Sequence, residues 1–289
     1  MCGIIGIIGK NPVGPLLLDG LKRLEYRGYD SAGVATLVGA GIDRRRAEGK
    51  LKNLAAVMEK KPIEGTTGIG HTRWATHGRP NEINAHPHMT PQVAVVHNGI
   101  IENFRELRRA LEKDGQSFET ETDTEVIAHQ LEGAFSLAII FSGQHDLMIG
   151  ARRGSPLAVG YGDGEMFLGS DALALAPLTD RICYLEEGDW AILSGKGAEV
   201  RDAQGSVVER PVKQTAVSGA LIGKGGYRHF MQKEIFEQPS VIGDTLTSYV
   251  DPLKRRVALP EVSCDLGNLP RLTISACGTA YIAGLVAKY

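Results

Sequence analysis

Apolar residues follow the first two positions in an almost unbroken run, GIIGIIG, from Gly3 to Gly9. A short apolar run punctuated by glycine is typical of a buried strand. Further on, apolar residues recur at helical spacing and predict helices over residues 13–26, 51–58 and 104–111. Between them, a strand should begin near Ser31 after a turn around Gly28, and another should cover Val93–Val96.

The pattern changes at Ala134, where short apolar stretches alternate with glycine-rich turns. Before this point, Thr122 and Glu125 have capping-box spacing, so a helix should begin there with Asp123 in its first turn. The alternation after it predicts a helix near residues 171–176 and successive antiparallel strands over 134–141, 146–152, 156–162, 165–170 and 182–193, with a weaker signal over 199–203. Helices in the first half and strands throughout indicate an α+β fold in which helices cover stacked sheets.

Residues 216–226 are rich in glycine and serine and are predicted to be a linker. The chain then divides into a domain over 1–215 and a second part over 227–289. In the second part a helix should open near Tyr227 and end at Pro239. The final residues, RLTISACGTAYIAGLVAKY, predict a strand, a turn and a helix, which is how an α/β domain opens. A parallel sheet needs further crossovers to bury its faces, so we expect the sequence to end within this domain.

Composition narrows the class of protein. The 289 residues are 43% hydrophobic and 23% charged, as in soluble globular proteins, and the formal net charge is −2. No polybasic surface for nucleic acid or an anionic membrane is implied. No apolar run reaches the length of a membrane span, and no signal peptide is recognisable. The cysteines form no CxxC pair and no disulfide framework, which favours a cytoplasmic location; they are Cys2, Cys183, Cys264 and Cys277.

Cys2 is the first candidate for chemistry. Removal of Met1 would place a thiol and a free α-amine on one residue, with unperturbed pKa values of about 8.5 and about 8. A nucleophile paired with the N-terminal amine is a known route to an activated nucleophile. The alternative is that Cys2 is an unremarkable small residue at a frayed start, and position alone favours that alternative.

Two further regions offer groups for acyl transfer. Asn98 and Gly99 could supply a side-chain and a backbone N–H to an oxyanion, although Asn-Gly is also a common turn. Residues 68–88 hold too many polar groups, with too little alternation, for an ordinary core strand. There, Arg73 could bind an α-carboxylate bidentately, or it could be a surface residue. Asp123 could bind an α-ammonium group, or it could be an acid in the first helical turn that interacts favourably with the helix dipole. Thr76 and His77 offer further polar contacts, and Trp74 an apolar lid.

A metal site is the less favoured interpretation of the histidines. Five of the eight lie between positions 71 and 97, but the spacing is not HExxH and no cysteine pair joins them. His86-Pro87-His88 is better explained as a hydrogen-bonded turn. The chain shows neither a P-loop nor a GxGxxG motif, and Cys183, Cys264 and Cys277 have no reactive sequence context.

These segments together resemble one family. MCGIIG, RLEYRGYDSAG, GHTRWATHG, NAHPH, VHNGIIEN and ETDTEVIAH resemble the glutaminase domain of the glutamine–fructose-6-phosphate aminotransferases. YRHFMQKEIFEQP and ACGTAY resemble the start of the sugar-phosphate isomerase domain of that family. The resemblance covers nearly the whole chain. Amidophosphoribosyltransferase and asparagine synthetase share the N-terminal Cys-Gly-Ile, but we do not expect GHTRWATHG or the YRHFMQKEI helix in them.

The resemblance implies an N-terminal-nucleophile hydrolase fold, a four-layer αββα sandwich of the class II glutamine amidotransferases. It implies that Cys2 attacks the glutamine amide, with its own amine as the base, and that Asn98 and Gly99 form the oxyanion hole. Arg73 and Asp123 would hold the α-carboxylate and α-amine, with Thr76 and His77 lining the site. Trp74 would gate a channel that delivers ammonia to fructose 6-phosphate, to make glucosamine 6-phosphate. The resemblance implies no metal or other cofactor and a homodimer formed through a complete isomerase domain.

Two departures from the family pattern matter. The family usually has a helical segment of some twenty residues where Gln130-Leu131-Glu132-Gly133 here makes a short junction, which affects the packing behind Asp123. In the isomerase part, Ala280 follows Thr279 where the family has serine, which leaves Thr279 as a partial sugar-phosphate site. These departures keep two alternatives open: a non-catalytic protein that binds glutamine or a sugar phosphate, and an N-terminal amidase with another amide substrate.

Overall fold

The computed structural model describes residues 2–115, 118, 120–126, 133–214, 226–251, 256–257, 271–276 and 278–287. The chain forms two compact units, Met1–Phe230 and Met231–Tyr289. The predicted domain boundaries at 215 and 227 stay predictions. The predicted linker, apart from Gly226, and the junction at residues 130–132 lie outside the described residues.

The first sheet of the larger unit is antiparallel throughout, with eight strands in the order β14-β11-β9-β10-β1-β4-β2-β3. The predicted N-terminal strand, β1, lies inside this sheet between β10 and β4. The strands are β1 Gly3–Ile8, β2 Ser31–Val38, β3 Gly41–Glu48, β4 Thr67–Arg73, β9 Ala158–Tyr161, β10 Met166–Gly169, β11 Arg181–Tyr184 and β14 Val212–Gln214.

The second sheet has six antiparallel strands in the order β13-β12-β8-β7-β6-β5. The predicted strand Val93–Val96 is the first half of β6. The strands are β5 His88–Met89, β6 Val93–Ile101, β7 Gly133–Phe141, β8 Met148–Arg153, β12 Trp190–Ser194 and β13 Gly197–Arg201.

The main core lies between the two sheets. Ile4 and Ile8 of β1 belong to it, whereas Ile5 and Ile7 pack with helices on the other face of the same sheet. Because β1 is buried on both faces, its sequence is continuously apolar and does not alternate. The helices on that outer face are α1 Gly14–Arg23, α2 Leu51–Lys60 and α4 Ala172–Leu175.

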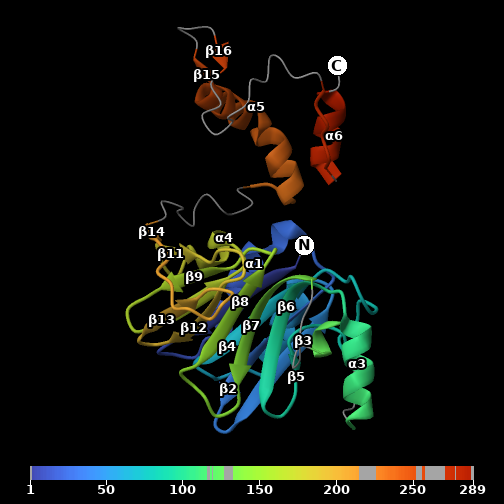
Figure 1. Ribbon diagram of the computed structural model, residues 1–289, viewed down its shortest axis with the longest axis vertical. Helices are drawn as coiled ribbons and strands as arrows, with labels where there is room; N and C mark the ends of the chain where they lie inside the picture. Colours follow the sequence, from blue (N-terminus) through green and yellow to red (C-terminus); the bar gives the residue numbers. More distant parts are fainter. Residues whose placement is uncertain are drawn as a thin grey trace. The chain divides into compact units, whose positions relative to one another are not determined.

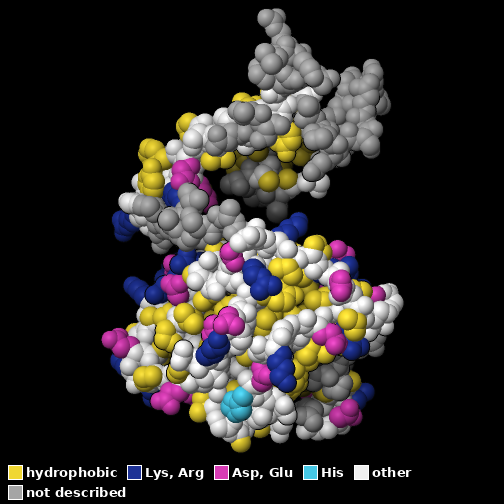
Figure 2. Space-filling view, turned by 90° about the vertical axis from the view of Figure 1, so that its left-hand side faces the viewer, with side chains coloured by type: hydrophobic (Ala, Val, Ile, Leu, Met, Phe, Trp, Pro, Cys, Tyr) yellow, Lys and Arg dark blue, Asp and Glu magenta, His cyan; other side chains and the backbone are white. Residues whose placement is uncertain are grey.

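Helix α3, Phe104–Lys113, packs against the other sheet through Leu111 and Ile101, close to the short 3₁₀ helix Thr124–Val126. The order of layers is thus helix, sheet, sheet, helix, and the predicted α+β fold with stacked sheets is confirmed (Figure 1). On the face shown in Figure 2, Lys and Arg side chains are interspersed with Asp and Glu side chains.

The prediction that residues 68–88 are too polar for a core strand is wrong for the first part of this stretch. All seven residues of β4 are buried, so Thr67–Arg73 is a core strand despite its polar side chains. Several of the polar groups have partners elsewhere: His71 Nε2 contacts the Asn98 side chain, and Arg73 donates to backbone carbonyls just after the strand, whereas Thr72 Oγ1 and His71 Nδ1 are buried without a hydrogen-bond partner in the described part of the structure.

The predicted capping box is also wrong. The Glu125 carboxylate accepts a hydrogen bond from the Thr120 amide at 3.0 Å, and the Thr122 hydroxyl bonds to His88 Nε2 at 3.1 Å. Both side chains therefore have other partners, and Asp123 lies just before the 3₁₀ turn instead of inside a first helical turn. The continuation of a helix past Val126 lies outside the described residues.

Three further predictions about the extent of strands and helices differ from the structure. The predicted strand 182–193 is two strands, since a turn between Glu186 and Asp189 separates β11 from β12. Residues 271–276 are described without strand pairing. Pro239 lies inside helix α5, Phe230–Tyr249, and does not end it. Proline removes one helical hydrogen bond there, and α5 bends along its length in Figure 1.

The smaller unit contains most of α5, the two-residue strands β15 Val250–Asp251 and β16 Arg256–Val257, and helix α6 Gly278–Val286. Within the described part of the chain, no helix combines the length and apolar character that a membrane span requires.

Candidate active site

Cys2 directly precedes β1 and is held at its side chain and its backbone. The Trp74 amide donates to Cys2 Sγ at 3.2 Å, and Sγ lies 3.6 Å from the Trp74 carbonyl oxygen. Trp74 follows β4, and β1 pairs with β4, so strand pairing brings these two residues together. Cys2 is therefore held in place by these contacts and is not part of a frayed N-terminus.

The environment of the thiol favours its protonated form. Burial raises the pKa of Cys2 above its ordinary value, and the Trp74 backbone contact and the nearby Arg73 charge only partly oppose this effect. A buried thiol of this kind needs a base before it can act as a nucleophile.

Asn98 reaches Cys2 from the other sheet. Its Nδ2 donates to the Cys2 carbonyl oxygen at 3.2 Å, and its Oδ1 lies 3.0 Å from His71 Nε2. Asn98 and Gly99 lie inside β6, which continues to Ile101, so the interpretation of Asn-Gly as a turn is wrong.

Gly99 has a conformation and surroundings that only glycine tolerates. Its φ is 137°, and a Cβ atom there would lie 2.0 Å from the carbonyl oxygen of Ala134 on β7. Glycine at this position therefore lets the backbone of β7 lie against β6, and Gly99 is also one of the residues that line a cavity next to Asn98.

A cavity of about 530 Å³ joins these residues. Five of the residues predicted from the sequence line it: Cys2, Trp74, Thr76, Asn98 and Gly99. The remaining lining residues are Arg27, Ile100, Ser155 and Pro156. The arrangement places a thiol, an amide side chain and an exposed backbone around one space, which suits nucleophilic attack on a carbonyl carbon.

Arg73, His77 and Asp123 lie close to one another but are not among the residues that line this cavity. Arg73 is 3% exposed and donates to the carbonyls of Gly78 and Arg79 at 3.3 and 3.2 Å, and to that of His77. Burial lowers its pKa, and the charges of Asp30, Cys2 and Asp123 oppose this. Asp123 accepts from the Ile101 amide at 2.9 Å and lies 4.0 Å from His77 Nδ1.

Thr279 lies in α6 of the smaller unit, and its side chain is not among those described. Its predicted phosphate contact stays a prediction.

Sequence reasoning missed Arg27. Its guanidinium donates to the Cys2 carbonyl at 3.4 Å and to the Ser170 hydroxyl at 3.3 Å, and it forms an ion pair with Asp171 at 2.5 Å. Arg27 therefore anchors the same carbonyl oxygen of Cys2 that accepts a hydrogen bond from Asn98. The residue belongs to the motif RLEYRGYDSAG, but only the fold shows what it contacts.

Four buried histidines lie between the sheets behind Asn98. The ring of His71 stacks on that of His86 at 4.2 Å, and His86 meets His88 edge to face at 4.4 Å. Burial lowers the pKa of all four, to about 3 for His71 and about 4 for His97. Their rings form hydrogen bonds with the side chains of Asn98, Thr122 and Thr124, and His86 Nδ1 accepts from the His97 backbone amide at 3.3 Å. Among the described residues, no group of His, Cys, Asp and Glu side chains is arranged to hold a metal ion.

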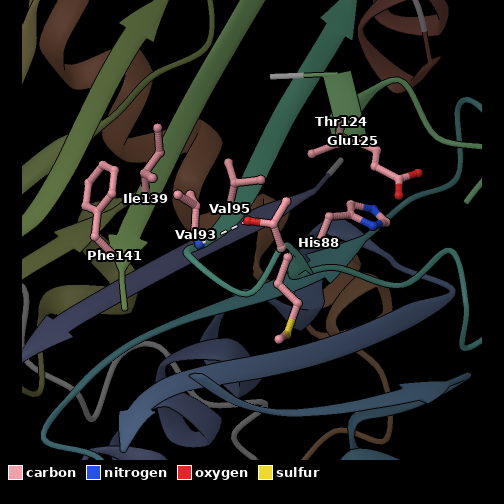
Figure 3. Close-up of a pocket in the computed structure, with 9 residues that line it drawn as sticks. His88, Val93, Val95, Thr124, Glu125, Ile139 and Phe141 are labelled. Carbon is pink, nitrogen blue, oxygen red and sulfur yellow. Dashed lines mark hydrogen bonds between the residues drawn. The ribbon is translucent and has the colours of Figure 1, made fainter. Parts of the chain in front are cut away.

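A second cavity, of about 330 Å³, lies at the β5 edge of the six-stranded sheet (Figure 3). Val93, Val95, Ile139 and Phe141 give it an apolar wall, and His88 and Glu125 lie on its other side. It contains none of the predicted site residues. The Cys2 cavity is therefore the better candidate for the reaction.

The chain is similar to known proteins over its whole length. Residues 71–177 match the glutamine amidotransferase domain family. The whole chain is 58% identical over 311 aligned residues to the glutamine–fructose-6-phosphate aminotransferase (isomerizing) of Bradyrhizobium diazoefficiens, of which it covers 51%. The proteins of the same name from Brucella abortus and Zymomonas mobilis are each 57% identical over 310 residues, again with 100% of this chain and 51% of theirs covered.

The chain thus spans about half the length of the curated relatives it matches. The alignments are also longer than the 289 residues of this chain, so the relatives contain residues that this chain lacks within the matched region.

Solved structures show the same fold in the larger unit. Glutamine phosphoribosylpyrophosphate amidotransferase from B. subtilis aligns with a TM-score of 0.60 and 25% identity, over 71% of this chain and 50% of that one. A structure described as the allosteric regulatory enzyme of purine biosynthesis aligns at 0.59 and 26% identity, over 70% and 49%. The predicted sandwich of the N-terminal-nucleophile type is confirmed.

Proposed function

Because this chain carries a glutamine amidotransferase domain, we propose that it hydrolyses the side-chain amide of glutamine to glutamate and ammonia, with Cys2 as the nucleophile. The observation that carries this proposal is the shared cavity of Cys2, Asn98 and Gly99. The hydrogen bond from Asn98 Nδ2 to the Cys2 carbonyl keeps the amide beside the thiol.

The chemistry follows from these positions. Sγ attacks the amide carbon, and the carbonyl electrons move onto oxygen, where the second N–H of Asn98 Nδ2 and the Gly99 backbone stabilise the charge. The C–N bond then breaks, and the nitrogen takes the thiol proton and leaves as ammonia. Water attacks the resulting thioester, gives its proton to sulfur and releases glutamate.

The proton of the thiol needs an acceptor, because burial raises the pKa of Cys2. We assign this role to the α-amine of Cys2 after removal of Met1, which itself lies outside the described residues. An amine with a pKa of about 8 can accept this proton near neutral pH.

Arg73, Asp123, Thr76 and His77 are assigned to glutamine recognition. Arg73 would bind the α-carboxylate and Asp123 the α-ammonium group, which matches their opposite charges and the position of Arg73 near both Cys2 and Asp123. In the structure Arg73 donates to carbonyls of the loop after β4, and Asp123 accepts from the Ile101 amide at the end of β6. These bonds fix the orientation of both side chains before substrate arrives.

The complete reaction is a further step of the proposal. The relatives are named as aminotransferases that use glutamine and fructose 6-phosphate, and this chain spans half of their length. We propose that ammonia passes Trp74, which is 53% exposed at the cavity, to fructose 6-phosphate held with the help of Thr279 in an isomerase domain.

Apolar side chains exposed on α5, such as Ile235 and Phe236, support packing of this part in a homodimer. The described cysteines, Cys2 and Cys183, are unpaired, in keeping with a cytoplasmic protein. The names of the relatives do not favour a non-catalytic binding protein.

The proposal is tested with an electrophilic glutamine analogue and mass analysis of the protein. One adduct on Cys2, together with loss of glutamate release in Cys2→Ala, is the expected result. Cys183→Ala is the matched control, because this second cysteine is 1% exposed on β11 and should leave labelling and turnover unchanged. Glutamate release that survives Cys2→Ala would show the assignment to be wrong.

A further inference from the structure

His71 is the nearest side chain behind the Asn98 amide. It projects from β4, is 0% exposed, and its Nε2 lies 3.0 Å from Asn98 Oδ1. The backbone of His71 pairs with Ile4 of β1 on one side and Gly33 of β2 on the other. Its ring also stacks on His86 with an interplanar angle of 17°. His71 is therefore held by stacking of its ring on His86 and by strand pairing of its backbone.

The contact to Cys2 decides how the Asn98 amide is oriented. A backbone carbonyl can only accept a hydrogen bond, so the amide end that faces the Cys2 oxygen at 3.2 Å must be the NH₂ group. The Oδ1 atom then faces His71. Since Oδ1 can only accept, the ring must carry its proton on Nε2 and donate to Oδ1.

The charge state of the ring agrees with this assignment. Burial lowers the pKa of His71 to about 3, so the imidazole is neutral at physiological pH. A neutral ring carries one proton, and the Asn98 contact places it on Nε2. His71 is thus a fixed donor and not a base that titrates during turnover.

We infer that His71 is a positioning residue for the amide hydrolysis: its Nε2–H holds Asn98 Oδ1 so that the Asn98 NH₂ group points at Cys2 and the cavity. The inference rests on the proposed function. Without this donor, the Asn98 amide can rotate and present its oxygen to the cavity, where a developing oxyanion would be repelled. His71 therefore supports the transition state through Asn98 and does not touch the substrate.

Two substitutions of His71 by amide residues test whether the position of the hydrogen-bond donor matters, because both introduce an NH₂ group but at different distances from the backbone. In His71→Gln the side-chain NH₂ replaces Nε2 at a similar distance from the backbone and should restore the bond to Asn98. In His71→Asn the amide is one methylene shorter and cannot reach. We expect kcat for glutamine within about threefold of wild type in His71→Gln, and a loss of about 10- to 100-fold in His71→Asn with KM nearly unchanged.

Two reagents that react with Cys2, glutamate γ-semialdehyde and iodoacetamide, distinguish loss of the oxyanion donors from a general structural defect. Glutamate γ-semialdehyde forms a hemithioacetal with Sγ, in which the S–C bond forms, the carbonyl π bond opens and the oxygen takes the thiol proton. That oxygen occupies the oxyanion position, so semialdehyde affinity should fall in His71→Asn by the same factor as kcat. Alkylation by iodoacetamide does not use the oxyanion donors and should proceed at the wild-type rate in both variants.

The outcomes are distinct. Equal kcat in His71→Asn and wild type, or equal losses in both variants, would overturn the role of His71 while leaving the proposed function intact. A wild type that neither releases glutamate nor binds the semialdehyde overturns both. If His71→Asn does not fold, the ¹⁵N spectrum of histidine-labelled wild type decides: a ring protonated on Nε2 supports the inference, and one protonated on Nδ1 contradicts it.

Discussion

Asn98 donates a hydrogen bond from its side-chain amide to the backbone carbonyl of Cys2, at a distance of 3.2 Å. The two residues are 96 positions apart, and they come from different sheets: Cys2 precedes β1, and Asn98 lies in β6. The site therefore exists only when the two sheets are packed. Its nucleophile is positioned by the start of an interior strand of one sheet, and its oxyanion donors by a strand of the other.

The free amine of Cys2 should be essential. A chain with one alanine inserted between Met1 and Cys2 keeps the thiol but turns its amine into an amide, which cannot accept a proton. Loss of this base should lower kcat for glutamine by about 100-fold or more. The measurement is glutamate release, with intact mass to establish the terminus of each preparation. Equal turnover of the two forms would mean that another group accepts the proton.

Gly99→Ala should destabilise the larger unit strongly. The new methyl group would meet the Ala134 carbonyl oxygen at 2.0 Å in a backbone with φ of 137°. We expect a loss of about 4 kcal/mol or more in the free energy of unfolding. Gly143→Ala is the matched control, because Gly143 has φ of 74° and open space around it, and should cost only about 1 to 2 kcal/mol.

Urea unfolding monitored by tryptophan fluorescence makes this comparison, since both tryptophans, Trp74 and Trp190, lie in the larger unit. Similar losses in the two variants would argue against the clash with Ala134.

The buried histidines should make the fold sensitive to acid. Burial lowers the pKa of His71 to about 3 and that of His97 to about 4, from about 6.5 in an unfolded chain. Between these values the unfolded state binds protons that the folded state excludes, so stability is complete above about pH 6.5 and falls as the pH is lowered towards 4. At pH 5 each such histidine should cost about 2 kcal/mol relative to pH 7.

Unfolding free energies measured from pH 8 to pH 4.5 test this. His229→Gln is the control, because His229 is exposed and its removal should leave the curve unchanged. A flat profile below pH 6.5 would show that the histidines take up protons without loss of the fold.

Asp123→Asn should separate recognition of glutamine from stability. The asparagine Oδ1 can still accept from the Ile101 amide, as Asp123 does at 2.9 Å, but the charge that would pair with the α-ammonium group is lost. We expect KM for glutamine to rise about tenfold or more, with the melting temperature little changed. Glutaramate, which is glutamine without its α-amine, is the control substrate and should be hydrolysed equally by both proteins. A rise in KM for both substrates would assign Asp123 a purely structural role.

The sequence by itself identified the elements that depend on local pattern. Continuous apolar residues predicted β1, helical spacing predicted α1, α2 and α3, and glycine-bounded apolar stretches predicted β7 to β10. The first candidates for chemistry, Cys2, Asn98 and Gly99, also came from the sequence, and the fold brings them to one cavity.

Only the tertiary structure decided the features that depend on distant partners. Thr67–Arg73 looked too polar for the core, yet it is a buried central strand in which His71 Nε2 contacts Asn98 and the Arg73 guanidinium donates to the carbonyls of 77–79. Glu125 looked like half of a capping box but bonds to Thr120 instead. Arg27 and His71, which hold Cys2 and Asn98, lie in motifs that are visible in the sequence, but their contacts could not be inferred from it. Spacing along a chain reports the period of one element, whereas hydrogen-bond partners across two packed sheets are set by the register and stacking of both.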